Sequence, residues 1–139
     1  MNPTVILYPV LVQVLLTFVM LVALGPTRSR SLKESGKTLD DADVRLGHAP
    51  YSSEATQVAR SYANQFELPV LFYAVVAFAL ITRGVDLLMV VLAWVFVLSR
   101  LVHAWIHTHA NVIKQRASAF LVGAVALAVM WIALAVHIL

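Results

Sequence analysis

Most of this chain consists of four apolar runs, each close to the roughly 20 residues that a helix needs to cross a bilayer. Hydrophobic residues make up 61% of the 139 residues and charged residues only 12%, about half of what a soluble domain carries. A helix satisfies the backbone hydrogen bonds of such a run internally. We therefore predict an all-α integral membrane protein, a bundle of four transmembrane helices that forms one domain over residues 1–139.

The helix boundaries follow from the ends of the apolar runs. The predicted helices cover about residues 4–24, 53–82, 85–109 and 116–138. Gly25 and Pro26 are expected to end the first helix, because this pair is a common helix stop. Residues 25–52 then form a long polar connection. Pro69 is expected to kink the second helix just past Glu67, because its nitrogen has no hydrogen to donate.

The distribution of basic residues predicts the orientation. Basic side chains gather in the first and third connections, namely Arg28, Arg30, Lys33, Lys37, Arg45, Lys114 and Arg116. The second connection holds only Arg83. The positive-inside rule then predicts that the two basic connections face the cytoplasm and that both termini lie on the other side. The net charge of +3 is accounted for by these loops, so we expect no nucleic-acid partner. The absence of cysteine excludes disulfides and thiolate catalysis by the protein itself.

Two rows of polar side chains interrupt the second and third runs. Their members are Arg60, Asn64 and Glu67 on the second helix, and Arg100, His103 and His107 on the third. The spacings i, i+4, i+7 and i, i+3, i+7 each place one row on one helix face. Ionisable groups inside a membrane are costly, and they normally face a partner, a cavity or a pathway. If the two helices are antiparallel neighbours, Glu67 and Arg100 reach similar depth, and we expect them to form an ion pair.

These rows leave several interpretations open. A buried Glu–Arg pair can be structural and touch no ligand. Two histidines four residues apart, with Glu67 as a third ligand, could hold a metal ion, but the nearby Arg100 would repel a cation, so we predict no metal site.

The two rows, the long first connection and Pro69 resemble the MAPEG family, the membrane-associated proteins in eicosanoid and glutathione metabolism. The matching motifs are Arg-xxx-Asn-xx-Glu at residues 60–67 and Arg-xx-His at residues 100–103. That family includes microsomal glutathione transferases, leukotriene and prostaglandin synthases and many bacterial members of unknown role. The resemblance implies a homotrimer of four-helix subunits, with glutathione bound between subunits in a cavity that faces the cytoplasm. We expect a bacterial-type member in the inner membrane.

The resemblance also implies residue roles. The side chains implied to contact or frame glutathione are Arg28, Arg30, Arg60, Asn64, Glu67, Arg100, His103 and His107. Among them, Arg100 would hold Glu67 in place, and Arg28 or Arg30 would add a contact to a glutathione carboxylate. Arg116 falls where the family has its active arginine, and the resemblance implies that it is catalytic. An arginine beside a thiol lowers the thiol's pKa and raises the fraction of nucleophile.

The chain departs from the eicosanoid-making branch of the family at four positions. That branch has hydroxyl-bearing residues where this chain has His107, Ala117 and Phe120, and an arginine where it has Ala63. The resemblance therefore implies a glutathione-dependent transferase or peroxidase that acts on lipophilic electrophiles, rather than an eicosanoid synthase. Two alternatives stay open: a non-catalytic protein that binds lipid or an anionic metabolite, and a purely structural membrane component. The expected partners are further copies of the chain, membrane lipids and a lipophilic small molecule.

Overall fold

A computed structural model describes residues 2–109 and 112–139. The elements are η1 (Pro3–Ile6), α1 (Leu7–Glu34), α2 (Ala42–Arg45), α3 (Ser53–Ala63), η2 (Asn64–Phe66), α4 (Leu68–Ile81), α5 (Leu87–Thr108) and α6 (Ile113–Ile138). Four helical stretches are long and apolar enough to cross a membrane: Pro3–Glu34, Ser53–Ile81, Leu87–Thr108 and Ile113–Ile138. The predicted all-α bundle with four membrane-length helices is therefore confirmed.

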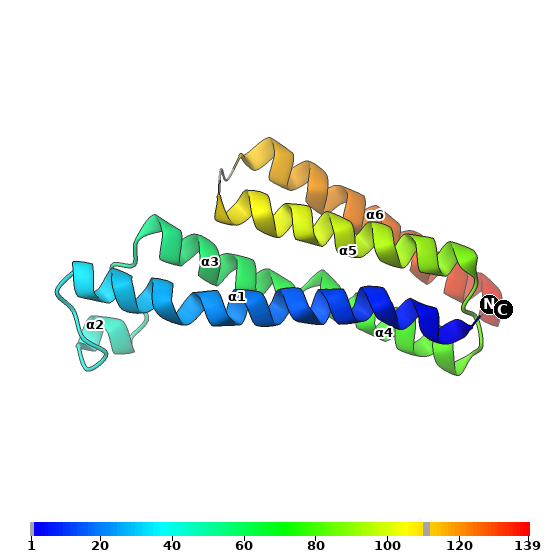
Figure 1. Ribbon diagram of the computed structural model, residues 1–139, viewed down its shortest axis with the longest axis horizontal. Helices are drawn as coiled ribbons and strands as arrows, with labels where there is room; N and C mark the ends of the chain where they lie inside the picture. The colour runs from blue at the N-terminus through cyan, green and yellow to red at the C-terminus, as the bar shows by residue number, and fades with distance from the viewer. Residues whose placement is uncertain (1, 110–111) are drawn as a thin grey trace.

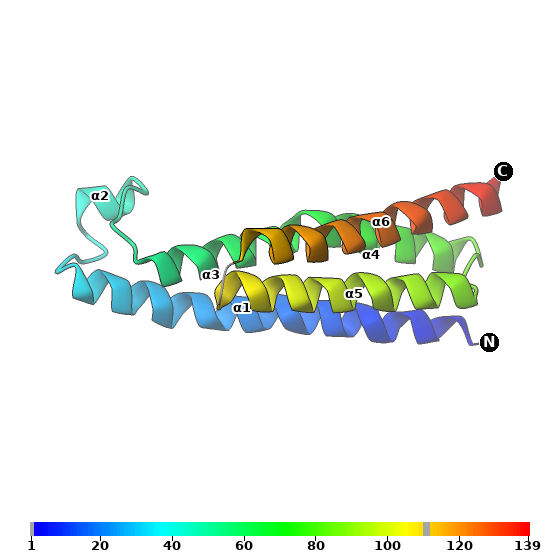
Figure 2. The ribbon, with the colours of Figure 1, turned by 90° about the horizontal axis from the view of Figure 1, so that it is seen from above.

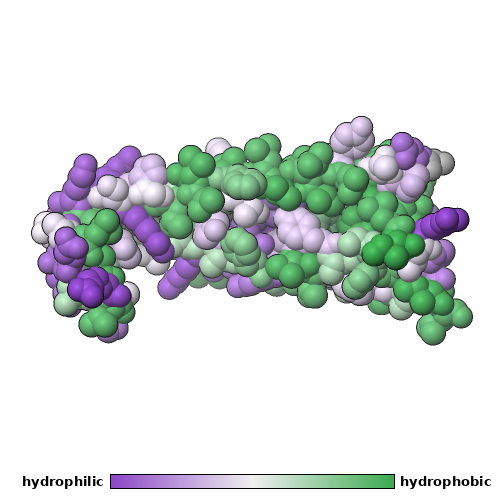
Figure 3. Space-filling model, turned by 90° about the horizontal axis from the view of Figure 1, so that it is seen from below, coloured by the Kyte–Doolittle hydropathy of each residue, from purple (hydrophilic) through white to green (hydrophobic). Residues whose placement is uncertain are grey.

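The long helices lie side by side along one axis (Figures 1 and 2). Both termini lie at one end of the bundle, and α2 lies at the other, which we call the connection end (Figure 1). Helix α5 packs against α1, α3 and α6, and α6 also contacts α4. Figure 3 shows apolar side chains along the length of the bundle and polar ones gathered toward its two ends, as contact with lipid requires.

The apolar core occupies the half of the bundle near the termini. Phe72 on α4 stacks on Phe96 on α5, with ring centroids 4.6 Å apart, and Met130 of α6 and Ile6 of η1 belong to the same cluster. Toward the connection end the buried side chains become polar, and they include Gln65, Arg100, His103 and His107. The change from apolar to polar interior places any ligand site in the connection half.

Helix α1 does not end at Gly25-Pro26, and the predicted boundary at residue 24 was wrong. The helix continues through Pro26 to Glu34. Just past Pro26, Thr27 Oγ1 donates to the carbonyls of Ala23 and Leu24, at 2.9 and 3.0 Å. Tertiary contacts hold the added turns, because Ser31 is buried and its Oγ accepts a 2.6 Å hydrogen bond from the backbone N–H of Ser52.

The second membrane helix is broken rather than kinked. Helix α3 ends at Ala63, a 3-10 turn follows, and Glu67 leaves helical geometry with φ −94° and ψ −108°. The break lies at and before Glu67, whereas the sequence predicted a kink just past it. Pro69 sits in the first turn of α4, where a missing N–H is tolerated, so proline starts a new helix here.

The other boundaries differ by a few residues. Helix α5 spans Leu87–Thr108, with Asp86 Oδ1 accepting a 2.8 Å hydrogen bond from the N–H of Met89 as its cap. Helix α6 starts at Ile113, three residues before the predicted start. Residues 110 and 111 of the predicted third connection lie outside the described residues.

Candidate functional site

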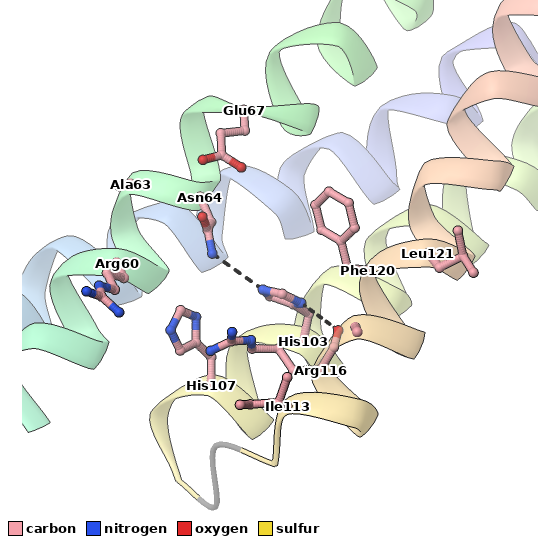
Figure 4. Close-up of a pocket in the computed structure, with 11 residues that line it drawn as sticks. Arg60, Ala63, Asn64, Glu67, His103, His107, Ile113, Arg116, Phe120 and Leu121 are labelled. Carbon is pink, nitrogen blue, oxygen red and sulfur yellow. Dashed lines mark hydrogen bonds between the residues drawn. The ribbon is translucent and has the colours of Figure 1, made fainter. Parts of the chain in front are cut away.

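A cavity of about 710 Å³ opens in the connection half of the bundle, between α3–η2, the end of α5 and the start of α6 (Figure 4). Its volume falls within the roughly 300–1,000 Å³ of small-molecule sites. The polar residues that line it are Arg60, Asn64, Glu67, His103, His107 and Arg116. The structure thus brings six of the sequence-predicted site residues, from the broken second membrane helix, α5 and α6, to one cavity. That they bind a ligand stays a prediction.

One wall of the cavity comes from α3 and the break that follows it. Helical spacing puts Arg60 and Asn64 one turn apart on the same face. The break then turns Glu67 toward the same space (Figure 4). Arg60 and Glu67 are exposed and Asn64 is half-buried, so this wall offers a cation, an amide and an anion to a ligand from outside the protein.

His103 ties the three walls together. Its Nδ1 lies 3.1 Å from the backbone carbonyl of Arg116, and its Nε2 lies 3.4 Å from Asn64 Nδ2 (Figure 4). A carbonyl only accepts, so Nδ1 carries the hydrogen, and Nε2 accepts from the Asn64 amide. A neutral imidazole with this tautomer satisfies both contacts at once. The buried ring therefore fixes α5 to the 3-10 turn and to the start of α6.

Arg100 lies behind the cavity rather than on its surface. Its side chain is 1% exposed, and Nη2 donates a 2.9 Å hydrogen bond to the backbone carbonyl of Asn64. Its guanidinium also lies over the ring of Phe120, 5.9 Å from the ring centroid. Nε and Nη1 make no hydrogen bond to any residue in 2–109 or 112–139.

The expected ion pair between Glu67 and Arg100 is not formed. No N–O distance of 4.0 Å or less joins the two side chains in the part of the chain that the structure describes. The broken helix explains the difference, because it leaves the carbonyl of Asn64 available and Arg100 bonds to that instead. Glu67 remains exposed at the cavity.

Comparison with known protein families settles the identity of the fold. A family model for the MAPEG family matches residues 6–136, nearly the whole chain. The chain belongs to the MAPEG family. Comparisons with curated proteins and with solved structures found no match. The resemblance inferred from the two polar rows is therefore confirmed for this MAPEG protein, and with it an integral membrane protein with several spans.

Two of the predicted site residues lie away from the cavity within a single MAPEG chain. Arg28 lies over the ring of Tyr51, with its guanidinium carbon 5.5 Å from the centroid. Arg30 forms an exposed ion pair with Glu54, at 3.8 Å. Any contact of these arginines with a ligand held by another copy stays a prediction.

The sequence interpretation named Ala117 and Phe120 only as departures from the family pattern, and it missed the apolar wall that they form with Ile113 and Leu121. This wall is formed by one face of α6, with Ile113, Ala117, Phe120 and Leu121. Their spacing of three and four residues, in register with Arg116, is the signal that would have found them. Ile113 and Leu121 are 69% and 62% exposed, so this wall continues onto the lipid-facing surface.

A buried amide pair behind the cavity was also missed. Gln13 Nε2 on α1 donates a 2.9 Å hydrogen bond to Gln65 Oε1, and Gln65 Nε2 donates to the carbonyl of Ser61 at 2.8 Å. Gln13 is fully buried, and Gln65 is 1% exposed. The signal that could have indicated this pair was one glutamine in each of two apolar runs, because polar side chains within a membrane normally find a partner. The pair holds the broken segment against α1.

Proposed function

We propose that this MAPEG protein is a membrane-bound glutathione-dependent transferase or peroxidase that acts on lipophilic electrophiles. The observation that carries the proposal is one cavity with Arg60, Arg116, Glu67 and an apolar wall, in a protein built of membrane-length helices. Glutathione has two carboxylates and one ammonium group. Arginines suit carboxylates through paired hydrogen bonds, and Glu67 suits the ammonium.

Arg116 is the residue that we propose activates the thiol. It lies in the first turn of α6, so the positive end of the helix dipole adds to the charge of its guanidinium. Both effects favour a thiolate over a thiol and so raise the fraction of the nucleophile. In the transfer, the sulfur bonds to the electrophilic carbon, the leaving group departs with its electron pair, and the thiol proton goes to water.

The apolar wall accounts for lipophilic substrates. Ile113 and Leu121 are exposed on the outside of α6, where acyl chains surround the bundle, and Phe120 continues the apolar surface inward. An electrophile dissolved in the membrane would thus reach the cavity without crossing water. A carbon electrophile leads to conjugation. With a hydroperoxide the thiolate attacks oxygen, the O–O bond breaks, and an alcohol leaves. The thiol of a second glutathione then attacks the sulfur of the resulting sulfenic acid, which forms a disulfide and releases water.

The proposal includes a homotrimer in the bacterial inner membrane, with the connection end in the cytoplasm. The support is the basic first connection and the extensive exposed apolar surface of the single chain. Arg30, which does not line the chain's own cavity, would then be available to the cavity of a neighbouring copy.

A non-catalytic binder of a lipid or an anionic metabolite is the second candidate. It is favoured by the missing hydroxyl groups at Ala117 and Phe120 and by the open apolar wall. Native mass spectrometry of gently extracted protein separates the two candidates. A retained fatty acid or phospholipid that glutathione does not displace supports the second candidate.

The test of the first candidate is conjugation of glutathione with 1-chloro-2,4-dinitrobenzene by purified protein. Arg116→Ala should lower kcat by roughly 100-fold, the usual effect of removing a group that stabilises a reacting anion. Lys114→Ala is the matched control, because Lys114 lies two residues away, is exposed and does not line the cavity. It should retain the parent's rate within about twofold. No conjugation by the parent, together with no glutathione binding by calorimetry, rules out the first candidate.

A further inference from the structure

We propose that the end of α1 and the connection after it form a binding site for the phosphate headgroup of an anionic phospholipid. A second cavity of about 360 Å³ lies there, separate from the ligand cavity. It is lined by Arg28, Leu32, Lys33, Lys37, Leu39 and Tyr51, among others. The site goes beyond the proposed catalytic function and does not depend on it.

The charges of this second cavity favour an anion. Lys37 is paired with Asp43, and this hydrogen bond, together with the charge of Asp43, raises the pKa of the Lys37 ammonium. Arg28 and Lys33 form no ion pair with any residue in the described ranges. Two cations are therefore left without an acidic partner, and the stacking of Arg28 on Tyr51 keeps one of them in place.

The second cavity lies at the depth in the membrane where lipid phosphates lie. The apolar run of α1 ends at Leu24, and Arg28 follows four residues later, about 6 Å along a helix that rises 1.5 Å per residue. The headgroup layer of one leaflet is about 5–8 Å thick. Arg28 therefore lies at headgroup level. Lys33 lies roughly 13 Å past Leu24, and its long side chain can reach back toward the membrane.

The apolar part of the rim argues for a lipid rather than free phosphate. Leu32 is buried beneath the cavity, and Leu39 is 74% exposed beside it. A large aliphatic side chain exposed next to cations is suited to the boundary between headgroups and acyl chains. Because α1 continues past Pro26, the same helix carries both the membrane span and these cations. Basic clusters directly beyond a span commonly bind anionic lipids.

The experiment measures which lipid the full chain retains. The protein is placed in nanodiscs with equal phosphatidylglycerol and phosphatidylcholine, released, and analysed by native mass spectrometry. The parent should retain phosphatidylglycerol preferentially. Arg28→Gln/Lys33→Gln should lower that preference by roughly tenfold or more, since each cation near the surface contributes to binding of anionic lipid. The control variant Arg45→Gln/Arg83→Gln removes the same charge from exposed positions outside the cavity. It should change the preference for phosphatidylglycerol by less than about twofold.

Two further results complete the test. If the parent retains both lipids equally, or the Arg28/Lys33 variant keeps the parent's preference, the proposal is overturned. Displacement of the lipid by excess inorganic phosphate would show a free-phosphate site and would also overturn it. The parent's own lipid preference is measured without any variant, so a variant that fails to fold leaves that test intact. Neither readout involves glutathione, so failure here is distinct from failure of the transferase proposal.

Discussion

Arg100 on α5 donates a hydrogen bond from Nη2 to the backbone carbonyl of Asn64, 2.9 Å away, where the second membrane helix breaks. The break makes this carbonyl available, and the buried guanidinium satisfies it. Asn64 and Glu67, which flank the break, both line the cavity. Arg100 thus supports the backbone that presents these two side chains, without facing the cavity itself.

A charge exchange between residues 67 and 100 should not restore stability. Arg100→Glu removes the donor to the Asn64 carbonyl and leaves two acceptors facing each other, so we expect a loss on the order of 3 kcal/mol in unfolding free energy. Adding Glu67→Arg supplies no donor to that carbonyl, because the two side chains form no ion pair. Thermal unfolding in detergent should show the double variant no more stable than Arg100→Glu. Recovery of half the loss or more would mean that a direct pair forms after all.

The Gln13–Gln65 amide pair behind the cavity should show an interaction energy in a double-mutant cycle. Gln13→Leu leaves Gln65 Oε1 without its donor, and we expect a loss of about 1 kcal/mol in unfolding free energy. Gln13→Leu/Gln65→Leu removes both partners, and its total loss should be smaller than the sum of the single losses. Denaturant unfolding of the four proteins measures this cycle. Strictly additive losses would show that the pair contributes nothing as a pair.

Two histidines one turn apart should respond differently to the same substitution. His103→Phe removes the 3.1 Å contact of Nδ1 with the Arg116 carbonyl and the 3.4 Å contact of Nε2 with the Asn64 amide. His107→Phe removes a ring whose buried Nδ1 has no hydrogen-bond partner among the described residues. We expect His103→Phe to cost roughly 1–2 kcal/mol more than His107→Phe in unfolding free energy. Equal losses at the two positions would contradict the network assigned to His103.

The change in stability caused by Gly25→Ala tests whether α1 continues past residue 25. Gly25 lies within the helix with no positive φ, and an added Cβ would meet no atom within 4 Å. Alanine should therefore stabilise the protein by roughly 0.5–1 kcal/mol. If the helix ended there with glycine in the left-handed region, alanine would destabilise the protein. The change in thermal midpoint distinguishes these outcomes.

The periodicity of polar residues predicted much of the cavity, because residues such as Arg60 and Asn64 reach the same space by helical spacing alone. Besides the break before Glu67 and the Gln13–Gln65 pair, three features escaped this reasoning. Gly25-Pro26 is a local stop signal, but the contact of Ser31 with Ser52, 21 residues apart, overrides it. The partner of Arg100 is a backbone carbonyl, which a pattern of side chains does not show.

The apolar wall on α6 was the third feature. Hydrophobic residues cover every face of a membrane helix, so composition does not distinguish those that line a cavity, such as Phe120, from those that contact lipid. The packing of α6 against α5 and α4 decides which face points inward.

The most direct test of the account is an electron cryo-microscopy structure of the purified protein with glutathione. We predict density for the tripeptide in the 710 Å³ cavity, with a carboxylate at Arg60, the ammonium at Glu67 and the sulfur near Arg116. Density at that position for another molecule, or an empty cavity at saturating glutathione, would contradict the account.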